Sequence, residues 1–231
     1  MKNPFQRPSP AIWEEPPTKL TPAVAGIWLH GWLRTRHMAA TLFDLAERGF
    51  LTISQEEDDV IFRRTEQKPD GLALYEQLWL KDLFGVTGET PFRVLPPRLS
   101  RLMQASERFI ERERQEIAHL KAKSDKAAWQ GFKQFLRLAE PAKAPELFAP
   151  YFAYAVAFGV ASEWASRFDE MTKLALPAWY FTPVEKDHLA GLVNLAAVIE
   201  KLLGEAARPF TIPVIPEAFL HGRDIPTGSG V

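Results

Sequence analysis

The chain of 231 residues contains no cysteine. Disulfide bonds, thiolate zinc sites and cysteine nucleophiles are therefore excluded, and a reducing compartment such as the cytoplasm is the expected setting. No run of about 18 consecutive apolar residues is present, so we expect no membrane-spanning helix. The first 22 residues contain six prolines and no continuous apolar stretch. We therefore expect no secretory signal peptide there.

Sequence motifs for common enzyme chemistries are also missing. The chain has no phosphate-binding glycine loop, no dinucleotide-binding fingerprint and no nucleophile elbow. The segment Gly85 to Thr90 has two glycines but lacks the lysine of a phosphate loop, so it is interpreted as a turn. We accordingly predict no catalytic residues and no cofactor. The hydrophobic fraction of 46% and the charged fraction of 25% are ordinary for a globular protein.

The net charge of −1 conceals a division along the chain. Residues 98–143 carry 11 Lys and Arg against 6 Asp and Glu, whereas residues 144–231 carry 6 against 10. The simplest consequence is that the basic and acidic parts face each other within the fold. A basic face that meets anionic lipid or nucleic acid is the alternative.

The N-terminal part predicts a winged-helix-like module over residues 22–85, after a proline-rich extended lead-in over residues 1–21. The lead-in offers only Ile12 and Trp13 as anchors. The module's elements follow from Pro22 at a first helical position, glycine stops, helical spacing of apolar residues and a short alternating pattern. They are helices at 22–32, 35–48 and 72–84, and a β-hairpin formed by residues 50–53 and 60–64.

Winged helices often bind DNA, so the charges of this module matter. The tip of the hairpin carries four successive carboxylates, which would repel a phosphate backbone. The start of the second helix offers three basic side chains. We therefore predict a surface for a protein partner, with nucleic-acid binding as the alternative. The residues of that possible partner surface are Arg34, Arg36, His37, Glu56, Glu57, Asp58 and Asp59.

The C-terminal part predicts a helical domain over residues 98–204, after a connector at 86–97 and before a mobile tail at 205–231. Its predicted helices cover residues 100–120, 126–139, 147–168 and 184–203. The helix at 147–168 is apolar nearly all round, which is typical of a buried helix, and its small residues predict close contact with neighbouring helices. The aromatic turn Pro177 to Phe181 is expected to fold back on the core. The predicted fold class is therefore mainly α.

One group of residues is compatible with a metal site. Two Glu-x-x-His pairs, Glu116 with His119 and Glu185 with His188, join Glu76 and Glu163 in the order of a di-metal helical bundle. However, Glu116 lies among arginines, and Glu185 in a first helical turn is explained by the helix dipole. We therefore predict no metal, and keep a di-metal protein as a second alternative.

Two blocks of the chain resemble a known family. The first is AATLFDLAERGFLTI at residues 39–53, and the second runs from Trp129 to Tyr180 with its aromatic-rich centre YFAYAVAFGV. Together they resemble the cytoplasmic C-terminal region of the YciQ-like predicted bacterial membrane proteins, domain of unknown function 2207. The resemblance covers roughly residues 22–181. It implies an extracellular β-rich domain before this region and a pair of transmembrane helices between the blocks, where this chain has the charged segment 107–126.

The resemblance brings no established activity and no catalytic residues. It implies work beside a membrane or with a membrane-bound partner. From the residues and this resemblance together, we predict a non-catalytic protein-binding or scaffolding module, cytoplasmic and associated with a membrane. The partner itself is not identified by the sequence.

Overall fold

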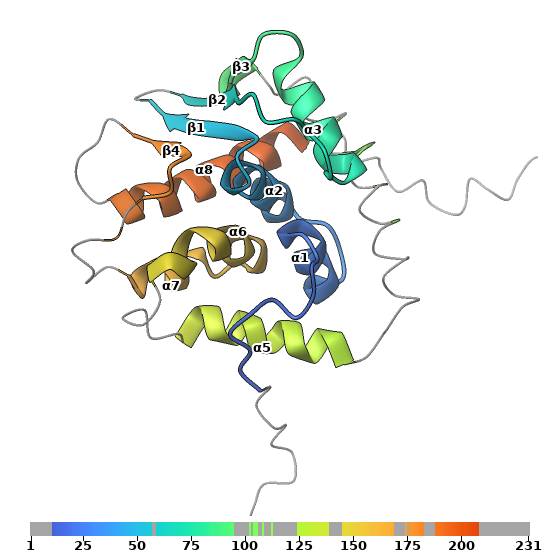
Figure 1. The fold of residues 1–231 in the computed structure, drawn as a ribbon, viewed down its shortest axis with the longest axis vertical. Helices are drawn as coiled ribbons and strands as arrows, with labels where there is room; N and C mark the ends of the chain where they lie inside the picture. The colour runs from blue at the N-terminus through green and yellow to red at the C-terminus, as the bar shows by residue number, and fades with distance from the viewer. Residues whose placement is uncertain are drawn as a thin grey trace, which may run out of the picture.

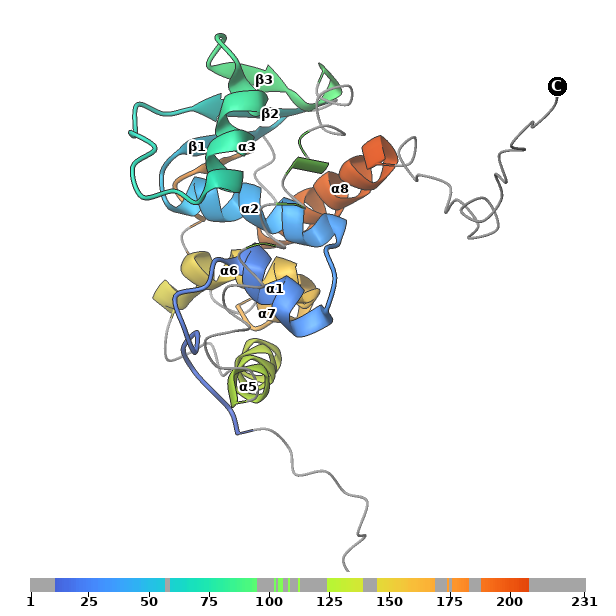
Figure 2. The same cartoon turned by 90° about the vertical axis from the view of Figure 1, so that its right-hand side faces the viewer.

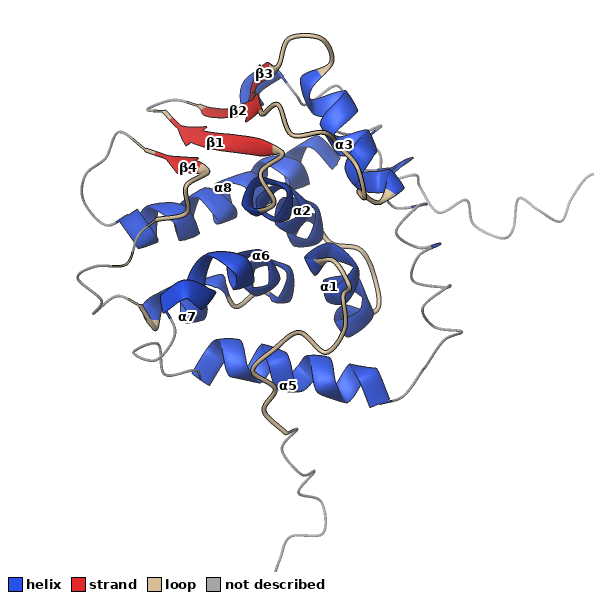
Figure 3. Ribbon diagram, in the orientation of Figure 1, coloured by secondary structure: helices blue, strands red, loops and turns tan. Residues whose placement is uncertain are grey.

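The structure is a computed structural model that describes residues 11–56, 59–94, 102, 104–105, 108, 112, 124–138, 145–168, 174, 176–182 and 188–207. The predicted helix at 100–120 falls almost entirely outside them. The described part is mainly helical with one small sheet (Figure 3), which confirms the predicted class. In chain order the elements are α1 (Pro22–His30), α2 (Thr35–Glu47), β1 (Leu51–Gln55), β2 (Val60–Arg64), α3 (Leu74–Phe84), β3 (Glu89–Pro91), η1 (Phe92–Val94), α5 (Ser124–Leu138), η3 (Pro145–Leu147), α6 (Phe148–Phe158), α7 (Ala161–Ser166), β4 (Tyr180–Phe181) and α8 (His188–Ala207).

These elements are stacked in layers (Figures 1 and 2). The sheet lies at one end, with α3 beside it on the outside of the fold. Below the sheet come α2 and α8, then α1, α6 and α7, and finally α5 at the opposite end. The chain thus places α3 and α5 far apart, on opposite sides of the central helices.

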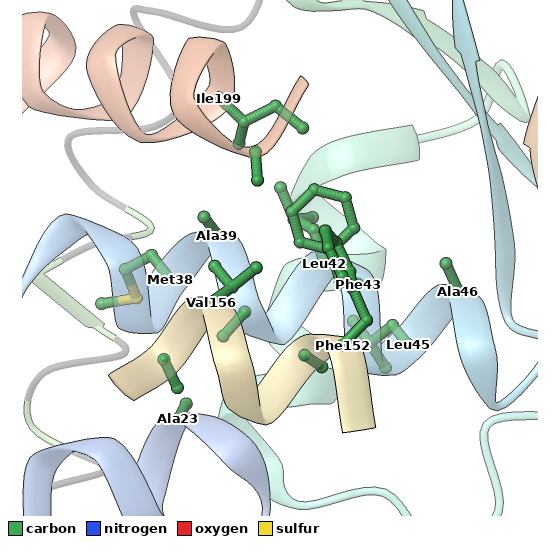
Figure 4. Close-up of a cluster of buried hydrophobic side chains, with 14 of the residues drawn as sticks. Ala23, Met38, Ala39, Leu42, Phe43, Leu45, Ala46, Phe152, Val156 and Ile199 are labelled. Atoms are coloured by element: carbon green, nitrogen blue, oxygen red, sulfur yellow. The ribbon is translucent and has the colours of Figure 1, made fainter. Parts of the chain in front are cut away.

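Helix α2 is the centre of the hydrophobic core. Its buried face includes Met38, Leu42 and Phe43, and it packs against α1, α6 and α8 (Figure 4). Phe43 is fully buried and meets Phe152 of α6 edge to face, with 5.3 Å between ring centroids. Each such buried side chain contributes about 1.5–3 kcal/mol relative to an exposed one. Packing on three helices therefore fixes α2, whose apolar spacing the sequence shows clearly.

The predicted single helix at 147–168 is wrong, because it is two helices. Helix α6 ends at Phe158, Gly159 follows in the left-handed conformation with φ 69° and ψ 39°, and α7 begins at Ala161. The N–H groups of Gly159 and Val160 bond to the carbonyls of Val156 and Ala155 at 3.0 and 2.8 Å, which is a Schellman C-cap. Gly159 is therefore an exposed helix stop and does not belong to a helix-packing face.

The predicted hairpin forms, with Leu51 opposite Arg64 and Gln55 opposite Val60. Two further strands, not predicted, complete a sheet of order β3-β2-β1-β4. Strand β3 is antiparallel to β2, and β4 is parallel to β1. The hairpin is consequently the middle of the sheet, and both of its edges are occupied.

Strand β4 belongs to the aromatic turn that was predicted to fold back on the core, and this prediction is confirmed. Trp179 and Tyr180 are buried, and the carbonyl of Trp179 accepts the N–H of Ile53 at 2.8 Å. The indole Nε1 of Trp179 donates to Glu47 Oε2 at 2.7 Å. These bonds tie residues more than a hundred positions apart in the sequence.

The predicted anchors of the lead-in, Ile12 and Trp13, are not buried, although Trp13 contacts α5. Ile12 and Trp13 are 58% and 46% exposed. The backbone at Ala11 crosses α5 at Gly131, where an added Cβ would lie 2.0 Å from the Ala11 carbonyl oxygen. Further along, the hydroxyl of Tyr154 donates to the carbonyl of Leu20 at 2.6 Å. At Gly131 an added Cβ would also lie 2.6 Å from Trp13 Cδ1, so the lead-in is held by its backbone at Ala11 and Leu20 and by the Trp13 ring against α5.

Side chains from both predicted domains belong to one hydrophobic cluster, which extends from Ala23 to Leu203. The boundary at 86–97 stays a prediction. Within the described ranges, no helix combines the length and the hydropathy that crossing a bilayer requires.

Candidate functional site

The structure distributes the predicted partner residues over two separate places. Arg34, Arg36 and His37 lie at the turn from α1 into α2, and Glu56 and Asp59 lie at the tip of the β1–β2 hairpin. Glu57 and Asp58 lie outside the described residues. His37 is 0% exposed, so it cannot belong to an exposed surface, and the prediction is corrected at this residue.

His37 instead forms a stacked pair with His30. The two rings are 5.3 Å apart at 9° between planes, and His30 Nδ1 lies 3.1 Å from His37 Nε2. Burial, followed by the charge of His30, lowers the pKa of His37 to about 3. Burial and the charge of Lys133 lower the pKa of His30 to about 4. Both rings are therefore neutral at pH 7.

The role of His37 follows from its bonds at the start of α2. Its Nδ1 accepts the backbone N–H of Arg34 at 3.0 Å, and its own backbone N–H donates to the Arg34 carbonyl at 3.0 Å. His37 thus replaces the usual carboxylate or amide of a capping box. Because Nδ1 accepts, the proton is assigned to Nε2, which then donates to His30. Glycine at position 26 makes room for the ring, since a Cβ there would lie 2.7 Å from His37 Cδ2.

Two cations meet at the C-terminal end of α6. Lys133 Nζ donates to the carbonyl of Phe158 at 2.8 Å, and the guanidinium of Arg36 lies over Gly159, whose added Cβ would be 2.1 Å from Arg36 Nη1. Cations are stabilising at this end of a helix because the helix dipole is negative there. Burial, with the charges of Arg137 and Arg36, lowers the pKa of Lys133.

Two more residues complete what we call the basic corner, defined as Trp32, Arg34, Arg36 and Lys133. Trp32 is 60% exposed, and Arg34 Cζ lies 4.7 Å from the centre of its ring. Arg34 Nε is buried without a hydrogen-bond partner among the described residues. Arg36 Nε is 3.4 Å from Glu200 Oε1 on α8, an ion pair that is too poorly aligned to be a hydrogen bond.

The two described carboxylates of the hairpin tip, Glu56 and Asp59, are each paired with an arginine. Arg63 Nε lies 2.8 Å from Glu89 Oε2, and Arg63 Nη2 lies 3.4 Å from Glu56 Oε1. Asp59 accepts the N–H of Val60 at 2.8 Å and lies 3.3 Å from Arg93 Nε. These surface pairs contribute little to stability, about 0–1 kcal/mol each. They do reduce the negative charge that the sequence places at the tip.

A polar pocket of about 440 Å³ lies between the lead-in, α2, α3 and α6. Arg48 Nη1 bridges two carboxylates there, at 2.8 Å from Asp44 Oδ2 and 2.7 Å from Glu76 Oε1. Burial, with the charges of Glu76 and Glu47, raises the pKa of Asp44 to about 6, against the hydrogen bond from Arg48. The residues that line the pocket are Lys19, Leu20, Thr21, Pro22, Val24, Asp44, Arg48, Gly71, Ala73, Glu76 and Tyr154.

Glu76 connects helices α2 and α3 at this pocket. Its side chain is 1% exposed, and its second oxygen, Oε2, accepts the backbone N–H of Ala73 at 2.8 Å. It therefore caps the start of α3 while it pairs with the end of α2. Since both oxygens are occupied by protein groups, the network joins two helices, and it presents no nucleophile with a base to activate it.

A third feature is an apolar groove on the outer face of α3. Its volume is about 420 Å³, and the residues that line it are Arg64, Pro69, Leu74, Gln77, Leu78, Leu80, Lys81 and Gly85. Leu74, in the first turn of the helix, is 57% exposed. The inner face of the same helix is buried through Tyr75, Trp79 and Leu83. The outer face of α3 thus carries the exposed Leu74 and the half-buried Leu78 next to the polar side chains of Gln77 and Lys81.

The residues of the di-metal alternative lie outside the described residues or have other partners. Glu116, His119 and Glu185 lie outside the described residues, and of His188 only the backbone is described. Glu76 is occupied by Arg48 and Ala73, while Glu163 on α7 lies 3.8 Å from Arg137. Among the described residues, no group of three His, Asp or Glu side chains could hold a metal.

Several residues of these sites were not singled out from the sequence. Arg48 follows Asp44 by four positions, a helical pairing that the sequence does show. Gly159 and Val160 after an apolar helix resemble a helix stop, which was missed because the apolar run continues beyond them. Lys133 gave no local indication, since its hydrogen-bond partner is on α6 and the charges that act on it include Arg36 of α2 and Glu163 of α7.

Comparison with known proteins gives one family. Residues 9–124 match the family model described as predicted membrane protein (DUF2207) C-terminal domain. The match includes the first block, residues 39–53, and ends before the second, so the resemblance over residues 129–181 stays a prediction. Neither the curated proteins nor the solved structures contain a match.

Proposed function

The chain belongs to that family of predicted membrane proteins, and from this premise we propose that it is a non-catalytic module that binds a protein partner through the outer groove of α3. The observation that carries the proposal is the 57% exposure of Leu74 beside the groove. Exposed leucines are common singly, but here Leu78, half-buried, follows one turn later on the same face. The two form an apolar strip with room for a side chain of another protein.

The charges around the groove indicate the chemistry of the partner. Arg64 and Lys81 are both exposed and line the groove. An amphipathic helix or extended segment would place apolar side chains against Leu74 and Leu78 and carboxylates near the two cations. Apolar anchors would supply most of the affinity, and the charges would favour acidic partners over basic ones.

We also propose that residues 22–85 form a winged-helix-like module. The order α1, α2, hairpin and α3 supports this reading, because the hairpin follows the second helix directly. In this chain β3 and β4 occupy the hairpin edges, and its tip is acidic. Both features favour a protein-binding module over a nucleic-acid regulator. The family description and the lack of cysteine support work in the cytoplasm beside a membrane.

The experiment compares three forms of the chain as bait in extracts of the native host, prepared with and without membranes. Leu74→Glu places a charge in the groove, and Leu138→Glu places the same charge at an apolar residue of α5 that is 52% exposed. Proteins captured by the parent and by Leu138→Glu, but lost with Leu74→Glu, are identified by mass spectrometry. Binding is then repeated with the purified partner by calorimetry.

The expected result is that Leu74→Glu weakens binding at least tenfold, which corresponds to roughly 1.4 kcal/mol, because an apolar anchor of a hot spot is removed. Capture of the same proteins by all three baits, or equal affinity of the purified partner for the two variants, would overturn the proposal. Thermal melting of both variants checks that the fold is retained.

A further inference from the structure

We propose that the basic corner, Trp32 with Arg34, Arg36 and Lys133, binds the phosphate groups of anionic membrane lipids. This site is separate from the α3 groove, because Lys133 is on α5 at the opposite end of the stack (Figures 1 and 2). The proposal therefore stands independently of the protein-binding role.

The first support is that the cations converge. Lys133 bonds to the carbonyl of Phe158 and Arg36 covers the next residue, Gly159, so the two charged groups meet at one peptide unit. Arg34 directly precedes α2 and is two residues from Arg36. Burial, with the charges of Arg137, Arg36 and Arg34, lowers the pKa of Lys133. Three cations from two elements thus share one small region.

The second support is that the three cations outnumber the carboxylates that act on them among the described residues. These are Glu163, whose charge opposes the effect of burial on the pKa of Lys133 and which lies 3.8 Å from Arg137, and Glu200. Glu200 is the carboxylate that pairs with Arg36, at 3.4 Å, and it also accepts from the hydroxyl of Thr35. The neighbouring imidazoles of His30 and His37 are neutral at pH 7 and supply no counter-charge. Arg34 Nε is buried and without a hydrogen-bond partner there. Because that Nε is covered, a lipid phosphate would be bound by the terminal N–H groups of the partly exposed Arg34 side chain, since guanidinium groups bind phosphate through paired N–H donors.

The third support is Trp32, which identifies the source of the phosphate. An indole that is 60% exposed beside an arginine is an amphipathic pair, and such pairs are favoured where apolar lipid meets charged headgroups. Nucleic acid also presents phosphates and stacks on aromatic rings. The chain belongs to a family of predicted membrane proteins, so a lipid surface is favoured.

The experiment measures co-sedimentation of the full chain with vesicles of phosphatidylcholine alone, and with vesicles containing about one-third phosphatidylglycerol. Arg34→Gln is the test variant, because the Arg34 side chain contacts the ring of Trp32, whereas Arg36 and Lys133 contact the end of α6. Lys126→Gln removes an exposed cation from α5, two turns before Lys133, and is the matched control. Arg34→Lys keeps the charge. Parallel arms add inorganic phosphate at constant ionic strength, or replace vesicles by random duplex DNA.

We expect binding only to the anionic vesicles, weakened about fivefold by Arg34→Gln, as removal of one cation near an anionic surface predicts, and retained by Arg34→Lys and Lys126→Gln. Binding should also fall when salt rises from about 50 to about 500 mM. The proposal is overturned if anionic vesicles do not bind, if Lys126→Gln weakens binding equally, if inorganic phosphate at millimolar concentration displaces the vesicles, or if duplex DNA binds more tightly than vesicles. Leu74→Glu should leave vesicle binding unchanged, which separates this test from that of the α3 groove.

Discussion

Replacing His37 by asparagine should make the stability of the fold less dependent on pH. His37 is fully buried, and burial lowers its pKa from 6.5 to about 3. The folded chain therefore holds His37 neutral, while the unfolded chain takes up a proton as the pH falls below 6.5. The contribution of His37 to the free energy of unfolding is fully present above pH 6.5. It decreases as the pH falls below 6.5 and is lost once the pH is below the pKa of the folded state.

The magnitude follows from linkage. Each pH unit between 6.5 and about 3 reduces the free energy of unfolding by roughly 1.4 kcal/mol for this one group, so lowering the pH from 6.5 to 5.0 should cost about 2 kcal/mol. His30, whose pKa is lowered to about 4, acts in the same direction. Asp44 acts in the opposite direction, because its raised pKa of about 6 makes the folded chain take up a proton first. Protonation also fills His37 Nδ1, which removes the acceptor for the Arg34 N–H and leaves the start of α2 uncapped.

The assay is urea unfolding of the parent and His37→Asn at pH 7.0 and pH 5.0. Asparagine at this position offers an oxygen near the place of Nδ1 and does not titrate. The variant should be less stable than the parent at pH 7, by about 1–3 kcal/mol, because the ring packing is lost. Its stability should nevertheless fall by about 2 kcal/mol less between the two pH values. Equal losses in the two proteins would refute the assignment of His37 as a buried neutral group.

Three further substitutions test the joints of the fold by urea unfolding. Asp44→Asn should increase stability at pH 7 by about 1–2 kcal/mol and change it little at pH 4, because the charged carboxylate is disfavoured by burial above its pKa of about 6; a loss at pH 7 would contradict this. Gly159→Ala should cost about 1–3 kcal/mol, because residue 159 has φ 69° and Arg36 lies where Cβ would be. Gly204→Ala in α8, where the nearest atom to an added Cβ is at 3.9 Å, is its control and should be neutral or stabilising by up to about 1 kcal/mol; similar losses in both would refute the C-cap argument. Glu76→Gln should cost about 2–4 kcal/mol, since it weakens both the Arg48 pair and the α3 cap, and a loss below about 0.5 kcal/mol would show that the joint is not structural.

Local patterns made most of the helices predictable. The spacing of Met38, Leu42 and Leu45 defines the buried face of α2, and α1 and α3 end at Gly31 and Gly85, within two residues of their predicted ends. The β1–β2 hairpin follows from its alternating segments. Each of these depends on residues within a few positions of one another, which is why the sequence reveals them.

The predictions were wrong where the structure of a residue depends on its own backbone conformation or on contacts with a segment far away in the sequence. The apolar run at 147–168 continues through Gly159, so the periodicity does not show that this residue adopts a left-handed conformation and divides the helix. Strand β4 contains two residues, too few for an alternating pattern, and it exists because β1 offers an open edge to pair with. His37 was expected at a surface because its neighbours are arginines, but its burial depends on how α1 packs against α2.

The sequence by itself determined that this protein is mainly helical, that α2 and α6 are apolar enough to be buried, and that cysteine chemistry is excluded. Only the tertiary structure decided which charged residues meet. Lys133, Arg36 and Arg34 come together because α5 and α2 both approach the end of α6, and Arg48 joins Glu76 because α3 begins beside the end of α2. The reason is physical: apolar burial acts over short sequence distances along one helix, whereas ion pairs, caps and the left-handed glycine depend on neighbours supplied by the packing of distant elements.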